Sequence, residues 1–351
     1  MSLEDRLKRR ISAFGPITIA DYMVAALTDP EEGYYRRRDP LGAAGDFVTA
    51  PEVSQMFGEL IGAWAAISWQ QMGRPDPFRL VELGPGRGTL MADALRATAA
   101  VPGFHAAKQL HLVEVGERLI ERQREALAAS TPTWHAELAA VPDGPAIVIA
   151  NEVLDTLPIR QLVRGGSTWE ERLVGIVGDE LAFVFGPTAL GSLVPPDLAD
   201  ALPGTTVEVS PARIALVDLL ARRLASQGGH ALLIDYGTPD SRAGGTLQAI
   251  RSHKPWPPLK EPGTADVTSH VDFGEVARAA RLAGAKVHGP IGQGLFLERL
   301  GIRPRAERLS ARDAGVAEAL GRLIDLDEMG TLFQAIAIAH PDLPIPAGFE
   351  T

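Results

Sequence analysis

One stretch of sequence decides the fold, Arg79-Leu-Val-Glu-Leu-Gly-Pro-Gly-Arg-Gly-Thr-Leu90. It begins with a short apolar run that only Glu82 interrupts, and it continues with Gly84, Gly86 and Gly88 at every second position. The residues that follow have apolar side chains at helical spacing. This order predicts a strand, a tight glycine-rich turn and a helix, the first half of a nucleotide-binding βαβ unit. The glycines permit the sharp turn and a close ligand, and the helix N-terminus offers free N–H groups.

The spacing of the glycines favours one class of ligand. Gly88 lies four positions after Gly84, whereas a dinucleotide fingerprint places its third glycine five positions after the first. Thr89 stands where a phosphate-binding loop would have a lysine. An acidic residue two positions before Gly-Pro85-Gly-x-Gly is typical of class I S-adenosylmethionine-dependent methyltransferases. The alternative interpretation is a glycine-rich turn that binds nothing.

The composition limits the classes of protein. The length of 351 residues allows one large or two modest domains, and the hydrophobic fraction of 46% is enough for a sizeable core. The net charge of −10, from 34 basic and 44 acidic residues, argues against binding to nucleic acid or to an anionic membrane. Without cysteine there is no disulfide, thiolate zinc site or cysteine nucleophile. No apolar leader and no 18-residue apolar window is seen, so we expect a cytoplasmic protein without membrane insertion.

The first 75 residues predict a helical or lid region. Two helices are expected over 3–28, with Thr18 capping the second, and a third from about 52 to 73 with Ile67 on its apolar face. Between them, Asp46-Phe-Val-Thr49 places an aromatic residue between polar side chains. Such a segment can cover a small ligand, so Asp46 and Thr49 are candidate ligand contacts.

Residues 76–351 predict a nucleotide-binding domain. A second strand over 109–115 carries Glu114 at its end, where an acid in such folds bonds ribose hydroxyls. The alternative is that Glu114 only begins the next helix, which is expected over 117–129. A weak third strand is expected around 133–136 and a buried parallel strand over 146–150.

Polar side chains follow the buried strand, in the order Asn151-Glu152-Val-Leu-Asp155. Ligands of open α/β sheets lie beyond the carboxyl ends of the strands, so these side chains are expected at the ligand edge. Two carboxylates and a carboxamide can hold a nitrogen nucleophile by hydrogen bonds. The alternative for Asp155 is that it caps a short helix. His253 and His270 lack acidic partners at metal spacing, and no metal site is expected.

The rest of the domain combines an antiparallel insertion with a return to the sheet. The insertion is expected over about 159–210, a helix over 211–226, and a lid-like proline-rich loop over about 238–271. A helix is expected over 272–283 and helices around 310–324. Further strands are expected over 231–237, 285–288, 294–297 and 331–338.

Several segments together resemble the MidA family. They are Gly45–Ser54, Glu82–Thr89, Asn151–Pro158, Asp235–Gly237 and Asp266–Phe273. The resemblance implies a Rossmann-like class I methyltransferase fold with a mostly parallel seven-stranded sheet, and S-adenosyl-L-methionine as methyl donor. It also implies a protein arginine as acceptor, because mitochondrial members are complex I assembly factors that symmetrically dimethylate an arginine of the 49-kDa subunit.

Our leading hypothesis is a protein arginine N-methyltransferase. The glycine turn with Pro85 and Thr89 would shape the donor pocket, Glu82 would orient the methionine amine and Glu114 would bind ribose. Glu152, helped by Asp155 or Asn151, would hold the guanidinium. Two alternatives are an assembly chaperone with a vestigial donor pocket and an NAD-dependent oxidoreductase, which the glycine spacing disfavours. The acceptor protein, the degree of methylation and the oligomeric state stay open.

Overall fold

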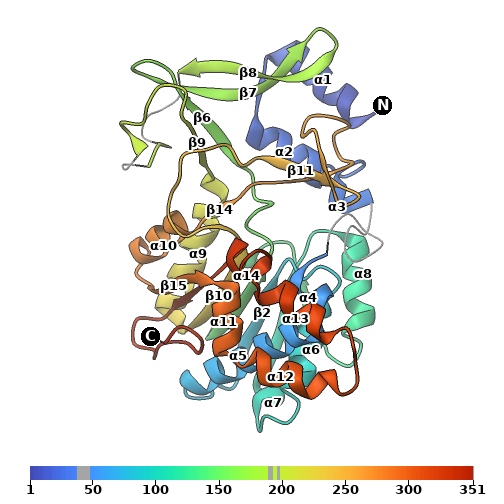
Figure 1. The fold of residues 1–351 in the computed structure, drawn as a ribbon, viewed down its shortest axis with the longest axis vertical. Helices are drawn as coiled ribbons and strands as arrows, with labels where there is room; N and C mark the ends of the chain where they lie inside the picture. Colours follow the sequence, from blue (N-terminus) through green and yellow to red (C-terminus); the bar gives the residue numbers. More distant parts are fainter. Residues whose placement is uncertain (38–47, 189–192, 196–197, 351) are drawn as a thin grey trace. The chain divides into compact units, whose positions relative to one another are not determined.

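The glycine turn belongs to the larger of two compact units into which the chain divides (Figure 1). The computed structural model describes residues 1–37, 48–188, 193–195 and 198–350. The first unit comprises residues 1–47, 155–215 and 241–270, and the second comprises 48–154, 216–240 and 271–351. The two units are defined by contacts within the folded chain. The expected domain boundary near residue 75 stays a prediction.

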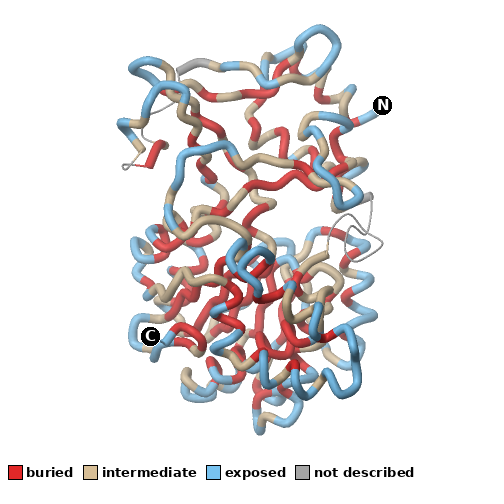
Figure 2. The backbone as a smooth tube through the Cα atoms, viewed as in Figure 1, coloured by how far each residue is buried: buried red, intermediate tan, exposed pale blue. Residues whose placement is uncertain are grey.

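A mostly parallel sheet forms the centre of the second unit, and its central strands β2, β5, β10 and β16 are mostly buried (Figure 2). Seven strands follow one path in the order β15-β16-β10-β5-β2-β3-β4, and β14 pairs with β10 beside it. Parallel pairs join β4, β3, β2, β5 and β10, whereas β16 runs antiparallel to β10 and to β15. The predicted fold class is confirmed. The strands are β2 (Phe78–Leu83), β3 (Lys108–Val113), β4 (Thr133–His135), β5 (Ala146–Asn151), β10 (Gly229–Thr238), β14 (Val271–Asp272), β15 (Lys286–Gly292) and β16 (Phe333–Ala339).

Helices pack against this sheet. Phe78 and Leu80 of β2 and Ile147 of β5 share a buried core with Phe57 and Trp64 of α5. Parallel strands buried in this way read as apolar runs in the sequence, which is why they could be predicted. The helices are α4 (Ala50–Val53), α5 (Gln55–Gln71), α6 (Thr89–Ala97), α7 (Phe104–Ala107), α8 (Glu117–Ala126), α9 (Pro211–Gln227), α10 (Phe273–Leu282), α11 (Gln293–Arg299), α12 (Ile302–Ser310), α13 (Val316–Ile324) and α14 (Met329–Leu332).

Three local predictions in the second unit were wrong. The expected helix over 52–73 is two helices, because Ser54 is extended and its side chain accepts from the N–H of Met56 to start α5. Ile67 is 38% exposed and lies outside the apolar face. The expected strand over 294–297 is part of α11, in which Gly294 and Leu297 are buried at helical spacing.

The first unit holds helices and the antiparallel insertion. Thr18 caps α2 as predicted, because its side chain accepts from the N–H of Asp21. The sheet order β1-β7-β6-β9, with β8 on β7, confirms the antiparallel insertion. The elements are α1 (Leu3–Phe14), β1 (Ile17–Thr18), α2 (Ile19–Thr28), α3 (Tyr34–Arg37), β6 (Arg160–Arg164), β7 (Trp169–Val177), β8 (Glu180–Thr188) and β9 (Thr206–Val209).

The expected lid-like loop contains a small sheet of its own. Its order is β12-β11-β13, with β11 (Gln248–Arg251), β12 (Lys254–Trp256) and β13 (Asp266–Thr268) all antiparallel. The prolines hid these strands from the sequence analysis, because proline removes backbone donors and marks loops. In the part of the chain that the structure describes, no helix is long and apolar enough to cross a membrane.

Candidate donor and acceptor sites

The glycine turn joins β2 to α6 at the carboxyl end of the strand. Gly84, Gly86 and Gly88 have φ of 57°, 54° and 83°, a region that residues with a Cβ rarely adopt. A Cβ on Gly84 would also lie 2.7 Å from Cγ2 of Val153. The conformation therefore requires glycine at this turn, and it leaves the amide groups at the start of α6 available to a ligand.

Glu82 lies two residues before the turn and is almost fully buried. Its Oε2 atom has no hydrogen-bond partner among the described residues, and burial raises the pKa of its carboxyl to about 8. A buried carboxyl without a partner is costly unless a ligand supplies a donor. An ammonium group would supply both the donor and the charge that ionises Glu82.

Glu114 follows β3 and is held by two kinds of donor. Its Oε1 accepts from the N–H groups of Val115 and Gly116 at 2.8 and 2.7 Å, and its Oε2 accepts from Nε2 of Gln123 at 3.2 Å. The hydrogen bonds from the two backbone N–H groups agree with the alternative role at the start of α8, for which Gly116 is the N-cap residue. The hydrogen bond from Gln123 ties the same carboxyl to the residue that contacts the glycine turn.

Gln123 is a residue of this site that the sequence analysis missed. It is fully buried, its Nε2 donates to the carbonyl oxygen of Gly86 at 2.7 Å, and its Oε1 accepts from the indole of Trp134 at 2.8 Å. One signal was available in the sequence. Gln123 lies at i+4 between Leu119 and Leu127 on the inward face of its helix, and a polar residue at such a position usually has a specific partner.

The helix α4 lies close to the turn through Glu52. Oε1 of Glu52 accepts from the hydroxyl of Thr89 at 2.6 Å, and its Oε2 is 3.7 Å from Nη1 of Arg87. Thr49 is the N-cap residue of α4 and makes no capping bond with its side chain. Asp46, the other predicted contact from this segment, lies outside the described residues.

Glu152 lies directly after β5, and its backbone has φ of 55°, so it leaves the strand by a sharp turn. Its Oε1 accepts from the N–H of Ala50 at 2.9 Å and from Nδ2 of Asn151 at 3.0 Å. Burial, and to a smaller degree the charge of Asp235, raises its pKa to about 7, against the hydrogen bond from Ala50. Among the described residues no donor contacts Oε2, so the two oxygens of Glu152 differ in their surroundings.

Asp235 holds the turn that carries Glu152. Its Oδ2 accepts from the N–H groups of Val153 and Leu154 at 3.1 and 2.8 Å. No helix is present over 152–158, so the alternative role of Asp155 as the cap of a short helix is not seen.

Asp155 belongs to the first unit. It is buried, and its carbonyl oxygen accepts from Nη2 of Arg213 at 3.2 Å and from the N–H of Ser269 at 3.1 Å. Burial, with Asp266 and Asp155 nearby, raises the pKa of Tyr35 well above its ordinary value. The structure thus brings Asn151 and Glu152 together in the second unit, and Asp155 takes part in a polar cluster of the first unit. No group of metal-binding side chains occurs among the residues described in the two units.

A mostly parallel sheet with an antiparallel last strand, a glycine turn after β2, and an acid after each of its neighbours β3 and β5 together define a class I methyltransferase fold. The chain belongs to the family described as "Putative S-adenosyl-L-methionine-dependent methyltransferase", whose model matches residues 60–291. S-adenosyl-L-methionine is therefore its cofactor, as predicted, and the suggested NAD-dependent activity is set aside.

Relatives match nearly the whole chain. A mitochondrial "Protein arginine methyltransferase NDUFAF7 homolog" of Drosophila melanogaster is 37% identical, over 99% of this chain and 89% of its own. The human protein arginine methyltransferase NDUFAF7 is 36% identical, over 95% of this chain and 82% of its own. The crystal structure of a "likely methyl transferase" from Burkholderia thailandensis bound to S-adenosyl-homocysteine has a TM-score of 0.87 at 32% identity. It covers 99% of this chain and 92% of its own.

Proposed function

We propose that this protein transfers a methyl group to a guanidinium nitrogen of an arginine in a partner protein, with symmetric dimethylation as the outcome. The observation that carries the proposal is the Glu152 carboxyl at the end of β5, with one oxygen fixed by Ala50 and Asn151 and the other available. The relatives named protein arginine methyltransferases support the choice of acceptor. A respiratory complex I subunit of the 49-kDa type is the partner that the family resemblance suggests.

Donor binding would use the residues around the glycine turn. Glu82 would pair with the ammonium of the methionine part and Glu114 with the ribose hydroxyls. Gly84, Pro85, Gly86, Gly88 and Thr89 would surround the ligand. The buried, unpartnered Oε2 of Glu82 supports this arrangement, because an ammonium provides the missing donor. It also speaks against a vestigial pocket, since an assembly chaperone has no need for such a group.

Glu152 would hold the acceptor. When bound, the cofactor would supply an activated methyl group on a sulfonium and would keep the electron pair of the broken carbon–sulfur bond as S-adenosylhomocysteine. Alignment of the attacking nitrogen is then the main requirement. An arginine guanidinium has five donors and stays protonated in proteins. Ionised Glu152 would accept a hydrogen bond at Oε2 from one guanidinium nitrogen and draw the positive charge toward it. The neighbouring nitrogen would then face the methyl group, and Glu152 would accept the proton that this nitrogen releases.

The test is the variant Glu152→Gln, which keeps the size of the side chain and removes its charge. Candidate acceptors are first found by incubating a cell lysate with labelled donor and wild-type protein. On such an acceptor, we expect methyl transfer to fall at least about a hundredfold. Affinity for S-adenosylhomocysteine should stay within about twofold of wild type, because Glu152 is assigned to the acceptor.

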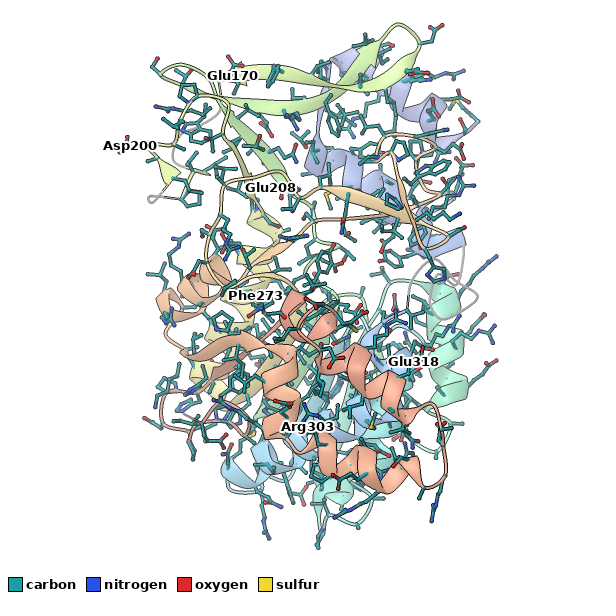
Figure 3. The ribbon with its side chains drawn as sticks, in the orientation of Figure 1. Glu170, Asp200, Glu208, Phe273, Arg303 and Glu318 are labelled. Atoms are coloured by element: carbon teal, nitrogen blue, oxygen red, sulfur yellow. The ribbon has the colours of Figure 1, made fainter. Side chains whose placement is uncertain are left out.

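The matched control is Glu318→Gln. Glu318 lies exposed on α13 of the second unit (Figure 3) and should transfer methyl groups at the wild-type rate. Wild-type turnover by Glu152→Gln would move the catalytic carboxylate to another residue, such as Asp235, and would weaken the arginine assignment.

A further inference from the structure

The helix α4 connects the two proposed sites within the second unit. It has four residues, Ala50–Val53, and no side-chain cap at its N-terminus. A helix of one turn has little stability of its own, so the contacts of its side chains and end groups set its position. Ala50 is fully buried and the side chain of Glu52 is 18% exposed, so both residues are well packed.

The contacts of α4 lead in two directions. At its first residue, the N–H of Ala50 donates to Oε1 of Glu152 at 2.9 Å. Two residues on, Glu52 accepts from the hydroxyl of Thr89 at 2.6 Å and lies 3.7 Å from the guanidinium of Arg87. Arg87 and Thr89 flank the last glycine of the turn. One short helix therefore contacts the proposed acceptor carboxylate and the glycine turn at once.

We propose that Glu52 is a positioning residue: by binding the glycine turn, it holds α4 so that the Ala50 N–H stays on the Glu152 carboxylate. The inference rests on the proposed function insofar as Glu152 receives the acceptor. In this proposal Glu52 acts through Thr89 and Arg87 of the glycine turn. Because the same turn surrounds the donor, the arrangement links the state of the donor site to the charge of the acceptor site.

The direction of the effect follows from the surroundings of Glu152. The bond from Ala50 stabilises the ionised carboxyl and lowers its pKa, and Asn151 and Arg322 of α13 act in the same direction. Asp235 of β10 and burial raise it. When α4 is released, the contribution of Ala50 is lost while the others remain. The pKa of Glu152 should then rise above about 7, and less of the carboxylate is ionised at neutral pH.

The test compares Glu52→Ala with Thr89→Val, which remove the two ends of the same hydrogen bond. The titration of Glu152 is followed by carbon NMR of labelled glutamate carboxyls in the full chain, with Glu152→Gln identifying the signal. In parallel, kcat/KM for the acceptor is measured at saturating donor across pH. We expect the titration to move upward in both variants. At pH 7 kcat/KM should fall by about fivefold, and at about pH 9 it should recover, because the carboxylate is then ionised in every variant.

Two controls make the outcome specific. Glu318→Gln, an exposed glutamate of the same unit, should leave both the titration and the pH profile unchanged. The double variant Glu52→Ala with Thr89→Val should show the effect of Glu52→Ala alone and not the sum, since Thr89→Val removes a hydrogen bond that Glu52→Ala has already removed. If Glu52→Ala does not fold, Thr89→Val alone carries the test.

Each result decides between the possibilities. If the titration of Glu152 moves in neither variant, the inference is overturned, whether or not activity falls. A loss of kcat/KM that is equal at all pH values would then mean an effect on donor binding alone. A titration that moves while transfer is unchanged at every pH supports the positioning role of Glu52. That second result would contradict the proposed role of Glu152 instead.

Discussion

The side-chain amide of Gln123 donates to the carbonyl oxygen of Gly86 at 2.7 Å, so a buried helix residue holds the middle of the glycine turn. The same amide nitrogen reaches Oε2 of Glu114 at 3.2 Å, and the amide oxygen accepts from Trp134. Three strand ends are tied together in this way, because Gly86 follows β2, Glu114 follows β3 and Trp134 lies in β4. One side chain thus holds the glycine turn and the carboxyl of Glu114 in place.

Replacement of Gln123 by methionine should weaken donor binding. Methionine has a similar size and keeps the packing, but it makes none of the three hydrogen bonds. We expect affinity for S-adenosylhomocysteine to fall by about tenfold, the effect of one to two hydrogen bonds of about 1 kcal/mol each. Calorimetry measures the affinity, and Gln109→Met, at an exposed position of β3, is the control. If the double variant with Glu114→Gln shows fully additive losses, Gln123 does not act through Glu114.

Gly86→Val should abolish donor binding. A branched side chain at φ of 54° strains the backbone and occupies space at the ligand edge. Calorimetry with S-adenosylhomocysteine measures the binding, and circular dichroism checks the fold. Gly178→Val is the matched control, because Gly178 has φ of 63° in the β7–β8 turn with no atom within 4 Å of an added Cβ. It should lose stability and keep its donor affinity, and a folded Gly86→Val with unchanged affinity would remove the turn from the site.

Glu114→Ala should weaken donor binding by about 1–3 kcal/mol through the loss of charged hydrogen bonds to ribose. The loss should be similar for S-adenosylhomocysteine and for methylthioadenosine, since both carry the ribose. If both affinities stay within twofold of wild type while the melting temperature falls, Glu114 serves only the start of α8, where it accepts from Val115 and Gly116.

Glu82 should make donor binding depend on pH. Its pKa of about 8 means that the free protein carries it protonated at neutral pH, whereas an ammonium ligand favours the ionised form. Binding of S-adenosylhomocysteine near pH 7 should therefore release close to one proton, measured by calorimetry in buffers of different ionisation enthalpy. Glu82→Gln should release almost none, and its affinity for methylthioadenosine, which lacks the ammonium, should match wild type. Equal proton release by wild type and variant would contradict the assignment.

The same group affects stability with a definite sign. The pKa of Glu82 in the folded protein, about 8, lies above the ordinary glutamate value of 4.5. The stability linked to its proton is therefore fully present below about pH 4.5 and is lost as pH rises through about 8. Without ligand, the melting temperature of the wild-type protein should fall over this pH range more steeply than that of Glu82→Gln. A parallel pH dependence in the two proteins would show that Glu82 is already paired.

The sequence by itself determined the mostly parallel sheet and the glycine turn. Strands such as 146–150 are apolar because both faces are buried, and the turn at Gly84, Gly86 and Gly88 needs glycine for its backbone. Both features are local, so they leave a pattern in adjacent residues. The break at Ser54 was not predicted, because Pro51 at the start of α4 is equally compatible with one continuous helix that begins there.

Only the tertiary structure decided which side chains meet. Gln123 contacts Gly86 across 37 positions, and Ala50 contacts Glu152 across 102. Asp235 binds the backbone just after Glu152 from a neighbouring strand. Such contacts depend on strand order and on the path of the backbone, which no short pattern encodes. The raised pKa values of Glu82 and Glu152 have the same origin, because burial is a property of the folded chain.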